Sequence, residues 1–167
     1  LAGYYFKFDK EVKPWNKTIL WYKLAQNIYK VGEGYRECIF EGNNTFSIVY
    51  GKSVYGKSIN NYIFYMDKKN CVVKEVFGAI ELIKSFPYYP EELHEYVLEK
   101  CKYLVFFIKI DPKDVSSKKI SVKPLYDAAR EYLQGKDDMV NPKYCLERDY
   151  RNDGRYVDKI ELYIPLK

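Results

Sequence analysis

The chain has 167 residues, of which 47% are hydrophobic and 31% charged, a size and composition that predict one soluble globular domain with a sizeable core. The net charge of +5 is mild and the lysines are spread along the chain, so a nucleic-acid surface is not indicated. No run of about 18 apolar residues occurs, which argues against a membrane-spanning helix. The chain begins with Leu1 and no leader precedes the fold, so we interpret it as a piece of a longer polypeptide or a processed chain.

The cysteines and the single histidine limit the kinds of metal and catalytic site that the chain is expected to form. The four cysteines, Cys38, Cys71, Cys101 and Cys145, are far apart, which favours buried thiols in a reducing, cytoplasmic compartment over a disulfide frame or a zinc site. His94 is the only histidine, so Ser-His-Asp, Cys-His and His-rich metal sites are set aside. We therefore expect neither a metal nor a cofactor.

The first half of the chain predicts a strand, a helix and two more strands. Residues 1–8 alternate in side-chain type, as a strand does. Apolar residues then recur at helical spacing after Asn16, and Gly32 lies where a helix C-cap belongs. Further strands are expected at about 44–50 and 59–67.

The second half repeats this order. Residues 101–110 form the strongest strand signal in the chain, and a helix is expected over 121–134 with Gly135 at its end. Residues 143–166 then alternate with a period of two on both sides of a turn at 152–154, which predicts a hairpin.

These patterns predict an α+β fold. Two βαββ units, at about 1–67 and 101–167, would form a mainly antiparallel sheet with the helices on one face and a ligand cleft on the other. We interpret residues 68–100 as a connection or insertion around the rim of the cleft, within one domain spanning 1–167.

The pattern G-x-x-x-x-G-K-S runs from Gly51 to Ser58. A phosphate-binding loop needs it between a strand and a helix, whose N-terminal N–H groups face the phosphates. The residues that follow read as another strand, so nucleotide binding at 51–58 is a remote alternative. Asp111 follows a strand and so resembles the magnesium-binding Asp of enzymes with such a loop. An Asp after a strand is common, so it adds little support for nucleotide binding.

Glu147 is the sharpest signal, and alternation places it on one strand face with Cys145 and Asp149. A carboxylate between aromatic walls can hold a lipophilic cation through its charge and through the ring quadrupoles. Desolvation would also raise its pKa, as at many functional sites. The alternative is a solvent-facing Glu147 paired with a Lys. The tyrosines near it in sequence or across the hairpin are Tyr144, Tyr150, Tyr156 and Tyr163.

One weaker site assignment comes from the residues alone. Alternation in the 59–67 strand adds Tyr65 as a pocket residue. Trp21, inside the first helix, is more often a core residue than a ligand contact. An acid/base pair of Glu147 and Asp149 is geometrically possible, but nothing else in the sequence supports a reaction, so an enzyme is not favoured.

Three stretches together resemble a known family. LAGYYF followed by TILWYKL, KYLVFFIKI followed by the 126–133 helix, and CLERDY followed by DKIELYIPLK cover most of the chain. They are similar to the opening strand and Leu-Trp helix, the middle strand and second helix, and the closing strands of the gyrase-inhibitor-like (GyrI-like) family. Its members are effector-binding domains of AraC-type and MerR-type transcription regulators, or free-standing proteins. The motifs are short, and 68–100 is longer than the family's pattern.

The resemblance implies a cytoplasmic sensor module that binds small, often aromatic and cationic molecules on its concave face. The resemblance also implies that Glu147 takes the place of the family's central acidic residue and that Tyr163 and Trp21 line the cavity. Asp149 is a weaker candidate for the same site. No helix-turn-helix signature is present, so DNA contact would belong to a fused or separate domain. Some relatives resemble small hydrolases, so an enzyme using Glu147 as general base or nucleophile stays open.

Overall fold

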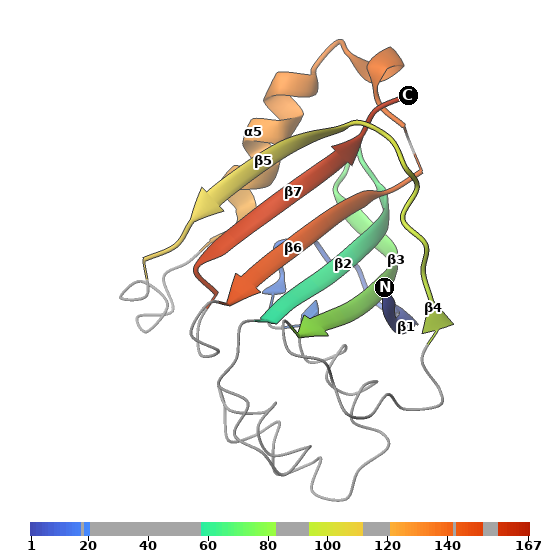
Figure 1. Cartoon of the computed structure of the whole chain (residues 1–167). Coiled ribbons are helices and arrows are strands. Elements are labelled where there is room, and N and C mark those ends of the chain that lie inside the picture. The colour runs from blue at the N-terminus through green and yellow to red at the C-terminus, as the bar shows by residue number, and fades with distance from the viewer. Residues whose placement is uncertain (18, 21–57, 83–93, 112–120, 142, 152–156) are drawn as a thin grey trace, which may run out of the picture.

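The computed structural model shows an α+β fold in which one long antiparallel sheet carries a helix on one face (Figure 1). The structure describes residues 1–17, 19–20, 58–82, 94–111, 121–141, 143–151 and 157–167. The elements are the strands β1 (Ala2–Lys7), β2 (Ser58–Asp67), β3 (Val72–Leu82), β4 (His94–Glu95), β5 (Tyr103–Lys109), β6 (Cys145–Arg151) and β7 (Lys159–Pro165), the α-helix α5 (Lys123–Leu133) and the 3-10 helix η2 (Asp137–Met139).

The seven strands are arranged in the order β4-β1-β3-β2-β6-β7-β5. The strands predicted at 1–8, 59–67 and 101–110 and the C-terminal hairpin are confirmed as β1, β2, β5 and the pair β6–β7. β2 and β6 are neighbours at the centre of the sheet, and their register places Tyr62 opposite Glu147. The candidate site residues on β2 and β6 therefore lie in the middle of the sheet, where each strand has a neighbouring strand on both sides.

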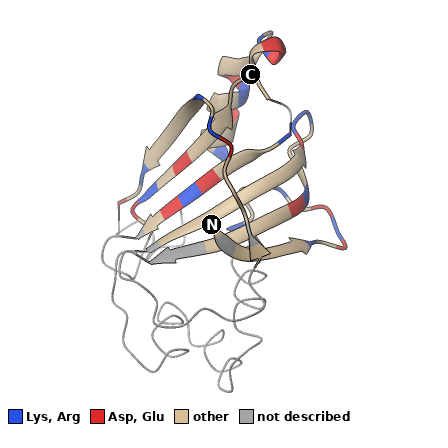
Figure 2. Ribbon diagram, turned by 45° about the vertical axis from the view of Figure 1, so that its right-hand side comes forward, with Lys and Arg blue, Asp and Glu red and all other residues tan. Residues whose placement is uncertain are grey.

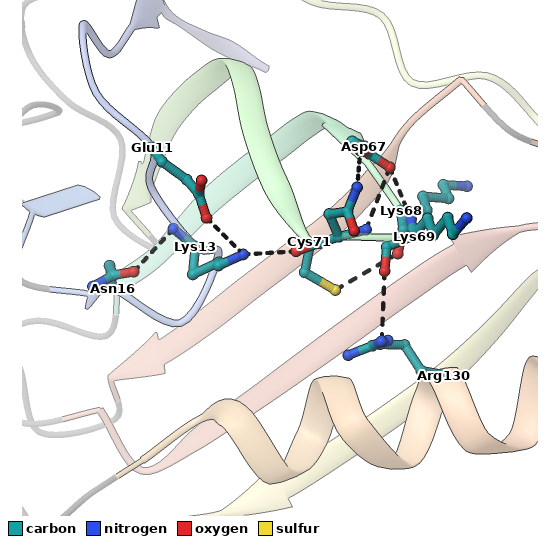
Figure 3. Close-up of polar contacts among 9 residues, drawn as sticks. Glu11, Lys13, Asn16, Asp67, Lys68, Lys69, Cys71 and Arg130 are labelled. Carbon is teal, nitrogen blue, oxygen red and sulfur yellow. Dashed lines mark hydrogen bonds and ion pairs between the residues drawn. The ribbon is translucent and has the colours of Figure 1, made fainter.

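The interpretation of 68–100 as a connection is wrong for Val72–Leu82, which form β3 between β1 and β2. A tight turn joins β2 to β3: the Asp67 carboxylate accepts the N–H groups of Lys69 (3.0 Å) and Asn70 (3.4 Å), and Cys71 has a φ of 51° (Figure 3). The apolar run in β3 fits a helix or a strand by periodicity alone. Pairing with β1 on one side and β2 on the other makes this segment a strand.

The first helix begins where the sequence predicts. Lys17, Ile19 and Leu20 are helical, and the Leu20 N–H donates to the Asn16 carbonyl (3.2 Å). The rest of this helix, the strand expected at 44–50 and most of the 51–58 motif lie outside the described residues. Ser58, the last residue of the motif, begins β2, so a strand stands where a phosphate-binding loop needs a helix.

α5 confirms the helix predicted over 121–134. The Ser121 hydroxyl accepts the Lys123 N–H (3.3 Å), and Gly135 follows the helix with a φ of +75°, which glycine adopts without steric cost. Its buried side chains pack on the sheet and are Leu125, Tyr126 and Ala129. No helix among the described residues is long and apolar enough to cross a membrane.

The sheet has apolar residues on both faces. We call the side on which α5 packs the helix face and the other side the tyrosine face. The helix-face core includes Leu20 from the first helix, Phe64 from β2 and Leu162 from β7. The tyrosine-face core is built on Ile63, Phe77, Ala79, Tyr144 and Leu146, with Tyr65, Tyr96, Tyr103 and Tyr163 packed around it.

Candidate functional site

The sheet separates the residues that the sequence assigned to one site. Glu147 is paired with Leu162 and lies on the helix face, whereas its neighbour Leu146 is paired with Tyr163 on the tyrosine face. Asp149 shares the face of Glu147, and Tyr65 shares that of Tyr163. Trp21 lies outside the described residues. The hypothesis of one pocket lined by Glu147, Tyr163 and Tyr65 together is therefore wrong.

Glu147 is fully buried and has two partners. Its Oε2 accepts the hydroxyl of Tyr126 from α5, and its Oε1 forms an ion pair with the Lys17 ammonium at the start of the first helix. Burying an isolated carboxylate would cost several kcal/mol of folding free energy, and the contacts with Tyr126 and Lys17 offset this cost. The solvent-facing alternative is wrong about exposure, although a lysine is indeed the partner.

The Lys17 ammonium lies in a cage of charge and aromatic rings. Besides Glu147, its Nζ is 3.8 Å from Asp149 Oδ2, 5.0 Å from the ring centroid of Tyr62 and 5.8 Å from that of Phe64. We call Glu147, Asp149, Tyr62 and Phe64 the cation cage. Two carboxylates and two ring faces are the groups that bind alkylammonium ions in proteins.

Burial controls protonation in this cluster. It lowers the pKa of the Lys17 ammonium to about 8, while the charge of Asp149 acts in the opposite direction. The ammonium is thus the major form at pH 7. Burial also raises the pKa of Tyr126 well above its ordinary value, so this phenol keeps its proton and donates to Glu147.

A buried amide adjoins the cage. Asn60 of β2 is opposite Asp149 in the register and is only 1% exposed. Neither its side-chain nitrogen nor its side-chain oxygen has a hydrogen-bond partner among the described residues. Buried polar groups are nearly always paired, so the Asn60 amide has a donor and an acceptor that the described residues do not satisfy.

A cavity of about 700 Å³ lies between α5 and the sheet, beside the cage. Tyr126, Cys145 and Leu162 form part of its wall, so Tyr126 both lines the cavity and donates its hydroxyl to Glu147. Lys68 and Arg130 lie at the cavity, and the Arg130 guanidinium reaches the carbonyl of Lys69 in the β2–β3 turn at 3.5 Å (Figure 3). Burial raises the pKa of the Cys145 thiol to about 12, which leaves it protonated and unreactive.

The tyrosine face has its own carboxylate, Glu161. Its Oε2 accepts the hydroxyls of Tyr150 (2.6 Å) and Tyr163, and Lys159 pairs with it at 2.8 Å. Burial acts to raise the pKa of Glu161, but the hydrogen bonds from these three neighbours outweigh it and lower the pKa. Figure 2 shows acidic and basic positions side by side on β6 and β7. The acid among the tyrosines is therefore Glu161, which sequence reasoning missed although alternation places it on the face of Tyr163.

Three further helix-face residues were missed: Lys17, Tyr62 and Tyr126. Each lies on a different element from Glu147 and far from it in sequence, so only the strand register and the packing of α5 reveal the cluster. Within the described part of the chain, no three His, Cys, Asp or Glu side chains are placed to hold a metal ion.

The sequence matches no protein-family model and no curated protein. The GyrI-like resemblance stays a prediction.

Proposed function

We propose that this chain is a small-molecule-binding module whose ligands join an apolar, aromatic body to a positive charge. The observation that carries the proposal is the ammonium of Lys17, held between Glu147, Asp149 and two aromatic rings. A cage that holds one alkylammonium ion has the charge and the ring faces to hold another.

The neighbouring cavity supports the apolar part of the proposal. Its volume of about 700 Å³ falls within the range of small-molecule sites, roughly 300–1,000 Å³. Tyr126 lines the cavity and its hydroxyl donates to Glu147, so a ligand body in the cavity would lie one residue away from the cation cage.

Binding would proceed by exchange of one cation for another. Lys17 is the most exposed part of the cluster, with 24% of its side chain accessible against 0% for Glu147. A ligand cation that displaces it leaves Glu147 paired, so the bound state contains no uncompensated charge at Glu147. The released lysine regains hydration and up to about 2 kcal/mol of rotamer entropy, which offsets part of the loss of its contacts.

The direct test is a pair of isosteric probes, phenyltrimethylammonium and tert-butylbenzene, titrated calorimetrically. We expect the cation to bind at least about tenfold more tightly than the neutral probe, and Glu147→Gln to remove that preference, since about 1.4 kcal/mol corresponds to tenfold. Glu161→Gln is the matched control, because it neutralises a carboxylate on the opposite face. Equal affinities for both probes in the unmodified protein would contradict the proposal.

The resemblance also suggests the finer architecture, and we propose that the fold consists of two βαββ units. The sheet order supports it: inward from the short edge strand β4, one half reads β1-β3-β2, and inward from the opposite edge the other half reads β5-β7-β6. In that arrangement the first unit closes with 72–82 rather than 59–67. Leu20 lies in the same core cluster as Leu125 of α5, which supports placing both helices on one face.

The sensor role is the extension of the same proposal. Ligand binding would act on an attached or separate DNA-binding domain only if that domain has two arrangements and the ligand binds more tightly in one of them than in the other. A hydrolase that uses Glu147 has less support, because both carboxylate oxygens already have partners.

A further inference from the structure

The two ends of the sheet differ in how they are protected. At one end is β4, a strand of two residues, His94 and Glu95. At the other is β5, with seven residues, of which only Lys109 is charged. Natural sheets protect their edges with short strands, charges, prolines or bulges, and β5 has almost none of these devices.

The pairing of β5 with β7 shows which backbone groups of β5 point away from the described part of the sheet. The Ile110 N–H donates to the Asp158 carbonyl (2.8 Å), and the Leu166 N–H donates to the Lys102 carbonyl (2.9 Å). Residues opposite each other in an antiparallel pair alternate between hydrogen-bonded and non-bonded positions, so the even-numbered residues of β5 bond to β7. The N–H and C=O groups of the odd-numbered residues, 103 to 109, therefore point away from the sheet.

Apolar side chains are exposed at this end. Val105 is 43% exposed and Phe107 62%, both on the tyrosine face. On the helix face, Tyr132 of α5 is 52% exposed and its ring centroid lies 5.8 Å from that of Phe106. Three of the seven exposed large hydrophobic residues in the described part of the chain thus gather around one strand.

We propose that β5 is an interface for a second copy of this chain, which pairs antiparallel with it about a two-fold axis at Phe106. This register pairs all seven residues of the strand with their counterparts. It places Val105 opposite Phe107 of the second copy and Tyr103 opposite Lys109 of the second copy. The pairs at 103, 105, 107 and 109 are the hydrogen-bonded ones, which are the positions whose backbone groups have no strand partner among the described residues.

Charge and side-chain chemistry favour a second copy as the occupant. The two Lys109 ammonium groups would be separated by six residues of strand, roughly 20 Å, which exceeds the Debye length of about 8 Å at physiological salt. Each would face a tyrosine ring, a favourable cation–π partner. Val105 and Phe107 form aliphatic–aromatic pairs, which stabilise antiparallel sheets.

The test is sedimentation analysis of the full chain over a protein concentration range, with Val105→Lys as the disrupting variant. We expect a dimer whose dissociation constant rises by at least about tenfold in Val105→Lys, since a buried lysine pair at the interface costs more than about 1.4 kcal/mol. Tyr5→Lys is the matched control: Tyr5 is also 43% exposed on the tyrosine face but belongs to β1, far along the sheet.

Hydrogen exchange of the backbone amides gives a second readout that does not require a variant. On dimerisation, the amides of Tyr103, Val105 and Phe107 should exchange more slowly, while the amides of β4 should not change. A protein that stays monomeric, or a dimer that persists unchanged in both Val105→Lys and Phe107→Lys variants with native circular dichroism, would overturn the proposal. Ligand binding at the cation cage does not enter either measurement, so the two proposals fail independently.

Discussion

The two faces of the sheet contain the same chemical set in two environments. On the helix face Glu147 accepts a hydroxyl from Tyr126 and pairs with Lys17, which lies 5.0 Å from a tyrosine ring. On the tyrosine face Glu161 accepts hydroxyls from two tyrosines and pairs with Lys159, whose Nζ is 4.2 Å from the ring of Tyr150.

Burial distinguishes the two sets. The Glu147 side chain has no exposed area, while that of Glu161 is 15% exposed. Water can partly solvate Glu161 if its lysine moves, whereas Glu147 depends on a cation that the protein or a ligand supplies. The same residue types therefore form a surface-type ion pair on one face and a cation-dependent site on the other.

Neutralising the carboxylate of each ion pair should give the largest difference in unfolding free energy between the two faces. We expect Glu147→Gln to lower the free energy of unfolding by roughly 3–5 kcal/mol, because it leaves the Lys17 ammonium buried without its main counter-charge. Glu161→Gln should cost about 1 kcal/mol or less, because that pair is partly solvated. Urea denaturation of both variants tests this, and equal losses would show that the burial difference has no energetic weight.

Replacing the whole helix-face pair should restore much of that loss. The double variant Lys17→Met with Glu147→Leu removes both charges and keeps similar volume, and such replacements of buried pairs are neutral or stabilising by about 1–4 kcal/mol. We expect it to unfold near or above the urea midpoint of the unmodified protein while losing the preference for cations. Retained cation preference in a fully folded double variant would place the binding charge elsewhere.

Local periodicity was sufficient to predict most strands, α5 and the face that Glu147 shares with Asp149. It could not predict β3, because a mostly apolar run that is flanked by a strand on each side has no distinctive period. Alternation also gives two faces without saying which one a helix covers. The prediction of one pocket for Glu147 and Tyr163 rests on their closeness across the hairpin and on the family resemblance, and neither one distinguishes the two faces. Lys17 was missed because only the folded arrangement brings it to Glu147.

High pH should weaken the fold through its buried tyrosines. Burial raises the pKa of Tyr126, so the folded chain keeps a proton that the unfolded chain loses above its ordinary value of 10.0. Stability from this group is fully present below about pH 10 and falls above it by up to about 1.4 kcal/mol per pH unit. Urea midpoints between pH 8 and 11 should fall less steeply in Tyr126→Phe, and the exposed Tyr132→Phe should match the unmodified slope.

Replacing Asn60, the buried amide beside the cation cage, should have the smallest effect on the free energy of unfolding. Asn60→Leu removes a buried polar group without a partner among the described residues, so we expect a gain of about 1 kcal/mol in unfolding free energy. The thermal midpoint is the measurement. A loss of similar size would mean that Asn60 hydrogen-bonds to a group that contributes to the fold.

The most direct measurement of cation exchange is acetylation of Lys17 in the unmodified protein, followed residue by residue by mass spectrometry. In the free protein Lys17 is held against Glu147, so it should react far more slowly than the exposed Lys102. Adding phenyltrimethylammonium should accelerate its acetylation and leave that of Lys102 unchanged, and tert-butylbenzene should accelerate neither. A Lys17 rate that stays constant as the cation saturates the protein would contradict displacement of the lysine.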